Sequence, residues 1–198
     1  MYISDKISSC LCKKLLKKKV ITDNTYSCYQ YSFDFVLDLI IFHVSIIVLG
    51  NLLKSPFLSF LYIMTMTPIK MLSGGAHAKT RTSCSLISYM IFASTILTIQ
   101  HQIIFFNPTT AIVIYLSNAI LILILTPVDT KNKRIPTAKR NNYKKNCGMI
   151  LSFITIFFFF FIVNQLSKPF SLITLCVIII LINQIIGILI NVFEHRKD

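Results

Sequence analysis

The sequence is poor in charged side chains, and acidic ones are the scarcest. Asp and Glu together number 7 in 198 residues, against 20 Lys and Arg, and charged residues make up only 14% of the chain. Hydrophobic residues account for 55%, which is too apolar for an ordinary soluble domain. This composition excludes the soluble globular class. It predicts a polytopic helical membrane protein, because a segment in lipid must satisfy its own backbone hydrogen bonds.

Carboxylates are almost missing from the apolar segments. Asp38 is the one acidic residue well inside such a segment, and Asp34 lies at its edge. A proton or ion pathway needs several such groups on successive turns, and the two halves of the chain show no repeat of the kind that transporters use. These absences argue against a secondary transporter. A small transporter or channel stays an alternative, and it would depend on Asp38, His43 and His101.

The first twenty residues lack an apolar core and a small-residue cleavage site, so we expect no cleavable signal peptide. The stretch KISSCLCKKLLKKKV instead puts Ile7, Cys10, Leu11 and Leu15 on one broad helical face, and five lysines follow from position 13 to 19. It predicts an amphipathic interfacial helix on an anionic inner leaflet, with a simple topology anchor as the alternative. The net charge of +13 therefore does not require a nucleic-acid partner.

Six apolar stretches are predicted to cross the bilayer as helices, since about 20 apolar residues suffice for a span. Their approximate ranges are 35–53, 57–69, 86–106, 111–126, 149–166 and 172–193. With a cytoplasmic N-terminus, 18 of the 20 Lys and Arg lie on the inner side, as the positive-inside rule requires. The predicted fold is therefore all-α with six transmembrane helices and both termini in the cytoplasm.

The predicted domain organisation follows from these spans. A basic N-terminal segment covers 1–34, a six-helix membrane domain covers 35–194, and a short cytoplasmic tail covers 195–198. Five of the six cysteines would face the reducing cytoplasm, so we expect no disulfide framework. The thiols also lack the neighbouring ligands of a zinc site, and we predict no metal and no cofactor.

The polar break SGGAHAKTRTSC, within a predicted loop over 70–85, carries the chemistry. Gly74 and Gly75 allow close approach of chain or substrate, His77 suits a general base at neutral pH, and Cys84 is the strongest available nucleophile. Seven residues on an unbroken helix would separate the two side chains by roughly 10 Å. A working pair therefore requires a non-helical break. We expect Ser83 to cap the third span, so that the helix dipole favours the Cys84 thiolate.

Two stretches resemble the accessory gene regulator protein B (AgrB) family, which comprises membrane cysteine endopeptidases of Gram-positive quorum sensing. They are GGAHAKTRTSC, which starts at position 74, and TPVDTKNKRIP, which starts at position 126. Chain length, the six-span layout and the basic loops also agree, so the likeness covers essentially the whole chain. The family often has Arg shortly before the glycines, where this chain has Lys70, which keeps the charge but loses bidentate geometry.

The resemblance implies a reaction and its partners. Cys84 would attack an AgrD-type pro-peptide at the start of its C-terminal tail, with His77 as the base. The tail would leave, and the acyl-enzyme would cyclise to a thiolactone or lactone autoinducing peptide. The resemblance also implies a homodimer in the plasma membrane of a Gram-positive bacterium, with its active site facing the cytoplasm. A non-enzymatic adaptor that presents a peptide or a histidine kinase is the remaining alternative.

Further residues are assigned to this site as hypotheses. A third group that orients His77 would be Asp129, with Ser73 and Asn132 as alternatives. A basic loop over 127–148 would attract the acidic tail of the peptide, although these charges also serve membrane topology. The side chains predicted to bind the tail are Lys70, Lys79, Arg81, Lys131, Lys133 and Arg134.

Overall fold

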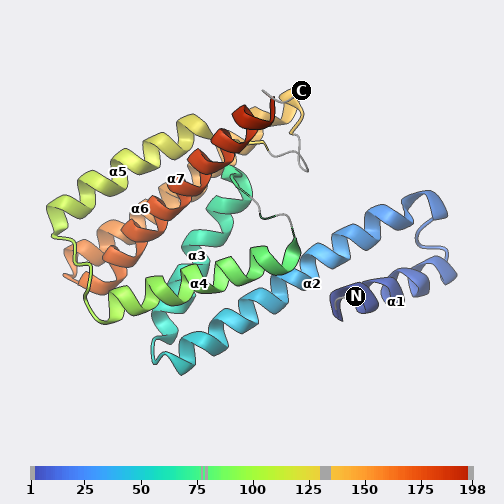
Figure 1. Ribbon diagram of the computed structural model, residues 1–198, viewed down its shortest axis with the longest axis horizontal. Coiled ribbons are helices and arrows are strands. Elements are labelled where there is room, and N and C mark those ends of the chain that lie inside the picture. Colours follow the sequence, from blue (N-terminus) through green and yellow to red (C-terminus); the bar gives the residue numbers. More distant parts are fainter. Residues whose placement is uncertain (1–2, 77, 79, 130–134, 196–198) are drawn as a thin grey trace. The chain divides into compact units, whose positions relative to one another are not determined.

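The computed structural model describes residues 3–76, 78, 80–129 and 135–195, and over this part of the chain the architecture is all-α (Figure 1). The prediction of an all-α fold is therefore confirmed, and the N-terminal basic stretch is helical as predicted. The helices are α1 (Ile3–Lys17), α2 (Asp23–Leu52), α3 (Pro56–Ser73), α4 (Arg81–Gln100), α5 (Pro108–Leu125), α6 (Thr137–Val163) and α7 (Ser167–His195).

Five described helices are long and apolar enough to cross a membrane, namely α2, α4, α5, α6 and α7. Each overlaps one of the predicted spans. The remaining predicted span, 57–69, lies in α3, an 18-residue helix that contains Pro68 and ends in a turn bearing Lys70. The structure thus supports an all-α membrane protein with several membrane-crossing helices, while the sixth span and the orientation of the termini stay predictions.

Helix ends differ from the predicted span ends because capping residues, and not hydropathy, decide where a helix starts and stops. Helix α4 begins at Arg81, ahead of the predicted 86, and ends at Gln100 with His101 as its C-cap. Helix α6 begins at Thr137, directly after Pro136. The second half of the predicted basic loop, 127–148, is consequently helical.

The chain divides into two compact units, Met1–Val48 and Leu49–Asp198. In the first unit, Ser4, Ser8 and Cys12 lie four residues apart on one face of α1, and all three are buried. Ser8 donates a hydrogen bond to the buried carboxylate of Asp34 in α2, which gives that charge the partner it needs. The small side chains of α1 thus face α2, whereas the apolar face that contains Ile7 remains exposed.

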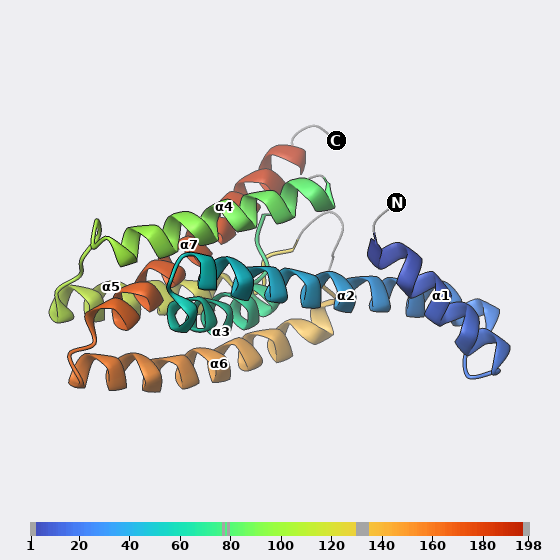
Figure 2. The same ribbon diagram turned by 90° about the horizontal axis from the view of Figure 1, so that it is seen from below.

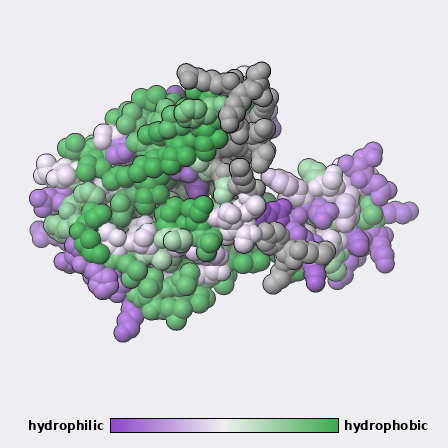
Figure 3. Space-filling model, viewed as in Figure 1, coloured by the Kyte–Doolittle hydropathy of each residue, from purple (hydrophilic) through white to green (hydrophobic). Residues whose placement is uncertain are grey.

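Helix α7 is the centre of the second unit. It contacts α3, α4, α5 and α6, and Figure 2 shows these helices arranged around it. Its most apolar window is 44% buried within the protein, against 22–28% for α4, α5 and α6. The outer helices expose large apolar side chains instead, and Figure 3 shows hydrophobic residues covering much of the visible face of this unit. Such a surface suits contact with lipid tails.

Aromatic side chains fix how the helices of the second unit pack. The buried ring of Tyr115 in α5 stacks on Phe158 of α6 with 4.2 Å between centroids, and its hydroxyl lies 2.9 Å from Thr155 Oγ1. Tyr62 of α3 meets Phe92 of α4 edge to face at 5.2 Å. These contacts pair α5 with α6 and α3 with α4.

We predict that the neighbouring thiols of α1 differ sharply in reactivity. Cys10 is exposed, whereas Cys12 is fully buried, and burial together with the nearby Asp34 carboxylate raises the pKa of the Cys12 thiol. Because the thiolate is the reactive form, maleimide should label Cys12 about tenfold or more slowly than Cys10. Mass spectrometry of membranes labelled for short times measures both rates in one sample. Equal rates would contradict the packing of α1 on α2.

Candidate active site

The polar segments after α3 and after α5 lie side by side, although they are far apart in the sequence. The backbone N–H of Val128 donates to the carbonyl of Ser73 at 2.8 Å. Gly74 and Val128 form a parallel bridge at the same place. The two family-like stretches of the sequence, one starting at Gly74 and the other at Thr126, therefore meet at one end of the second unit.

Both segments are also bound to a polar interruption in α7. The backbone N–H of Ala76 donates to the carbonyl of Asn183 at 3.0 Å. The side-chain nitrogen of Gln184 lies 3.3 Å from the Ser73 carbonyl and 3.3 Å from Thr126 Oγ1. Polar groups in the middle of an apolar helix are costly unless they are paired. Here they serve as the surface on which the two segments dock.

Glycines allow this docking to be close. Gly74 and Gly75 have φ values of 75° and 129°, a backbone conformation that other residues rarely adopt. A Cβ atom on Gly75 would collide with the side-chain nitrogen of Asn183, and one on Gly187 of α7 would lie 2.7 Å from the Gly75 carbonyl carbon. Glycine is therefore required on both sides of the contact, which explains the glycine pair of the motif.

Cys84 is the fourth residue of α4, and the start of this helix is capped by Thr80. Thr80 Oγ1 accepts a hydrogen bond from the Ser83 N–H at 3.2 Å, and the Thr80 carbonyl accepts one from the Cys84 N–H at 3.1 Å. The prediction that Ser83 caps this helix is therefore wrong, because Thr80 has the extended backbone and the free oxygen that a cap needs. Cys84 does lie beside the positive end of the helix dipole, as expected.

Accessibility distinguishes Cys84 from the other cysteines of the second unit. Cys84 is half-buried, whereas Cys147 and Cys176 are fully buried. A nucleophile must reach its substrate, and the half-buried position of Cys84 leaves its thiol accessible. Among these three cysteines, Cys84 is the one placed to react.

Several predicted site residues lie outside the described part of the chain. They are His77, Lys79, Lys131, Asn132, Lys133 and Arg134, so the predicted His77–Cys84 pair stays a prediction. Of the others, Lys70 belongs to the last turn of α3, Ser73 is its buried last residue, and Arg81 is the exposed first residue of α4. Ser73 at the end of α3 and Cys84 in the first turns of α4 thus flank the segment between these two helices.

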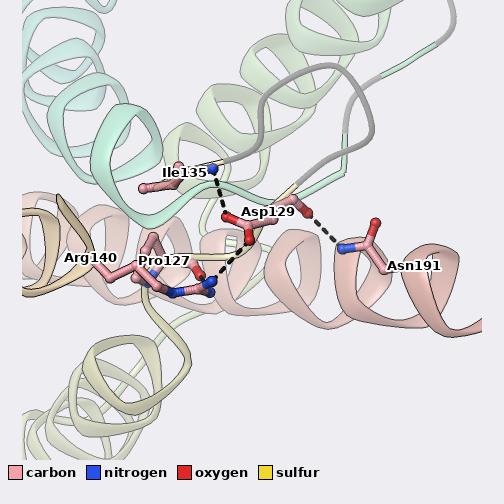
Figure 4. A network of polar contacts seen from close by, with 5 residues as sticks. All are labelled: Pro127, Asp129, Ile135, Arg140 and Asn191. Carbon is pink, nitrogen blue, oxygen red and sulfur yellow. Dashed lines mark hydrogen bonds and ion pairs between the residues drawn. The ribbon is translucent and has the colours of Figure 1, made fainter. Parts of the chain in front are cut away.

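Asp129 lies at the centre of a second polar network (Figure 4). Its carboxylate pairs with Arg140 of α6 at 2.9 Å and accepts a bond from the Ile135 N–H at 3.4 Å. Its carbonyl accepts a bond from the side chain of Asn191 in α7 at 2.6 Å, while Arg140 also reaches the Pro127 carbonyl at 3.0 Å. Both carboxylate oxygens are engaged in holding the segment after α5, which favours an anchoring role for Asp129 over the orienting role considered above.

A cavity of about 520 Å³ adjoins this network. Its lining is mainly apolar with a few polar groups, a combination that suits a peptide segment with mixed side chains. Its lining consists of Leu125, Pro127, Val128, Asp129, Arg140, Ile188, Asn191 and Val192. Within the described ranges, no three His, Cys, Asp or Glu side chains gather to hold a metal ion.

Sequence reasoning missed the contribution of α7 and of Arg140. The signal was present in the stretch LINQIIGILIN, where Asn183, Gln184 and Asn191 interrupt an otherwise apolar helix. Polar residues inside a span are expensive and are candidates for function by default. The same rule makes Asp38 and His43 of α2 candidates for function, and it applies equally to Gln184 of α7.

Comparisons with known proteins identify the family of the chain. The model of the family described as "Accessory gene regulator B" matches residues 4–188. Two relatives from Clostridium perfringens carry the names "Putative AgrB-like protein" (strain SM101) and "Putative AgrB-like protein 2" (strain 13). They are 28% and 27% identical over 165 residues, which cover 79% of this chain and 71% of each relative. No solved structure matches the chain significantly.

We predict that Gly187→Ala disturbs the docked segment and that Gly148→Ala does not. A new Cβ at 187 meets the backbone of Gly75 and Ala76 at 2.7–2.9 Å, whereas one at 148 meets only a Leu123 methyl group at 3.7 Å. Overpacking against backbone should cost about 1–3 kcal/mol. Gly187→Ala should therefore lower the melting temperature in detergent and change the rate of Cys84 alkylation. Identical behaviour of the two variants would contradict the close contact.

Proposed function

Because the chain belongs to the accessory gene regulator B family, we propose that it is a membrane-embedded cysteine endopeptidase that removes the C-terminal tail of a quorum-sensing pro-peptide. The resemblance seen in the sequence is thus confirmed at the level of the family. Membership supports a role in the processing of agr signalling peptides. The residues and the chemistry described next are our proposal.

The position of Cys84 carries the proposal. Its thiol is partly accessible at the start of α4, and hydrogen bonds join Ser73 and Ala76, which precede it in the chain, to the segment after α5 and to α7. A preorganised backbone around an accessible thiol is what acyl transfer requires, because the nucleophile must be held near the scissile carbonyl. Neither a channel nor an adaptor needs this arrangement.

In the first step, His77 takes the proton of the Cys84 thiol, and the sulfur attacks the carbonyl carbon that joins the signal segment to the tail. The tetrahedral intermediate collapses when the peptide C–N bond breaks. The imidazolium of His77 gives its proton to the leaving amine, and the tail departs with a free amino terminus. A thioester between the signal segment and Cys84 remains.

In the second step, the internal Cys of the peptide, or Ser in some substrates, attacks this thioester. The new ring bond forms as the bond to Cys84 breaks, and the proton of the attacking group returns to the Cys84 sulfur through His77. One thioester replaces another when the attacking residue is Cys, so the free-energy change is small. Water would hydrolyse the intermediate, and a site at the boundary of the bilayer limits its access.

Basic side chains would hold the acidic tail of the substrate near this site. Lys70, Arg81 and the positive residues around 131–145 lie on or next to the segments that meet there. We propose that they raise the local concentration of the tail. The cavity beside Arg140 offers apolar walls for the residues that precede the cut.

The cellular setting belongs to the same proposal. We place the protein in the plasma membrane with six spans and with both termini and the active site on the cytoplasmic side, because the Lys and Arg residues are distributed in that sense. The lysine-rich α1, whose apolar Ile7 and Leu11 are exposed, would lie on the anionic inner leaflet. We also propose a homodimer, as the family likeness implies.

We predict that tail removal depends on Cys84 and His77 alone among the cysteines and histidines. Proteoliposomes with a tagged pro-peptide would be followed by mass spectrometry for wild type, Cys84→Ala, Cys84→Ser and His77→Ala. Only wild type should release the tail rapidly and carry a peptide-sized thioester adduct on Cys84, and loss of either residue should reduce the rate by about 10³-fold or more.

The matched control is Cys147→Ala, which removes a buried thiol from the same unit and should retain activity. Cys84→Ser should form little or no adduct, because an unactivated hydroxyl is a much weaker nucleophile. Tail release that persists in Cys84→Ala would refute the mechanism, and attention would turn to the polar residues Asp38 and His101.

A further inference from the structure

Gln184 is an unusual residue for its position. It is fully buried in α7, the helix that contacts the other four helices of its unit, and its neighbours in sequence are mainly apolar. A buried amide in such surroundings costs free energy unless its groups are hydrogen-bonded. Leu or Met would fill the same space at lower cost, so the amide is retained for what it binds.

The amide nitrogen of Gln184 connects three helices. It donates to the carbonyl of Ser73, the last residue of α3, and to Oγ1 of Thr126, the C-cap of α5. These contacts span 111 and 58 residues of sequence. Both acceptors stand where a helix ends and a family-like polar segment begins. One side chain of α7 therefore fixes the starting points of both segments.

The Ser73 carbonyl also accepts a hydrogen bond from the segment after α5. Ser73 accepts one bond from Gln184 and another from the Val128 N–H, so the two lone pairs of its oxygen are both used. Removal of the Gln184 donor would leave this junction with the Val128 bond alone. The carbonyl of Ser73, where the stretch toward Cys84 begins, would then be held by one hydrogen bond instead of two.

We propose that Gln184 is a positioning residue of the peptidase site, which acts by joining Ser73 to Thr126 and so fixing the point from which the chain runs on to Cys84. This inference rests on the proposed function. Gln184 would act through the position of Ser73 and not by contact with the reacting atoms.

Asp129 is a less suitable lock for this purpose. Its ion pair with Arg140 joins residues only 11 apart, and the two side chains are 31% and 41% exposed. An ion pair at such a solvent-accessible position contributes little stability. The Gln184 contacts are buried and link separate helices, and so they constrain the site more strongly. The amide oxygen of Gln184 has no partner among the described residues, so the contacts to Ser73 and Thr126 come from its nitrogen.

The first test compares Gln184→Met with Thr174→Val in the proteoliposome assay. Met keeps the size of the side chain and removes the donor. Thr174 is equally buried in α7, but its hydroxyl bonds only to the Phe170 carbonyl of its own helix, so its loss is a matched control. Gln184→Met should lower kcat for tail release about 10- to 100-fold with KM for the pro-peptide within about twofold, because substrate still binds but meets a displaced nucleophile. Thr174→Val should stay near wild type.

The second test uses Gln184→Glu and pH. Burial raises the pKa of a carboxyl group, and the protonated form can donate one hydrogen bond in place of the amide. The activity of Gln184→Glu relative to wild type should therefore fall as the pH rises, whereas the relative activity of Gln184→Met should not change with pH. This variant also decides the question if Gln184→Met does not fold.

The outcomes separate this inference from the proposed function. If wild type shows no Cys84-dependent tail release, the proposed function fails. If wild type is active and Gln184→Met keeps kcat within about twofold, or loses activity only through a higher KM, Gln184 is not a positioning residue. A loss in Thr174→Val equal to that in Gln184→Met, or a pH-independent activity ratio for Gln184→Glu, would also overturn the inference.

Discussion

Hydrogen bonds to buried backbone groups govern how this site is built. Two polar segments enter a bundle whose other side chains are largely apolar, and each backbone group they bring must find a partner there. Helix α7 supplies the partners through the carbonyl of Asn183 and the amide of Gln184. The Ser73–Val128 bond joins the two segments to each other. Ser73 and Ala76, which these contacts hold, precede α4 and Cys84 in the chain.

The remaining features of the site follow from that docking. The glycines at 74, 75 and 187 are needed because backbone touches backbone where the segment meets α7. Thr80 then starts α4 and leaves Cys84 at the positive end of that helix, accessible and beside a fixed backbone. The Asp129–Arg140 pair and Asn191 hold the far end of the second segment. A thiol presented in this way suits acyl transfer, for which position matters as much as reactivity.

The sequence was informative where a local rule applies. Apolar length located five helices that are long and apolar enough to cross a membrane, and the motif around Cys84 identified both the family and the accessible thiol. Span ends were less predictable, because Thr80 and Pro136 set the starts of α4 and α6 independently of hydropathy. The pairing of Asp129 with Arg140 and of Gln184 with Ser73 depends on which helices become neighbours. No local pattern encodes that, although the buried Asn183–Gln184 pair marked α7 as unusual.

Cross-linking of the Cys84-proximal segment to α7 tests the central claim most directly, which is that this segment is docked on the polar interruption of α7. The Ala76→Cys/Asn183→Cys protein, treated in membranes with a short bifunctional thiol reagent, should form a 76–183 cross-link that mass spectrometry detects, because the two backbones are hydrogen-bonded at 3.0 Å. Ala76→Cys/Lys168→Cys, whose second cysteine lies about 22 Å from Asn183 along α7, should cross-link far less. Equal yields from the two pairs, or no 76–183 product, would contradict the docking of this segment and with it the site described here.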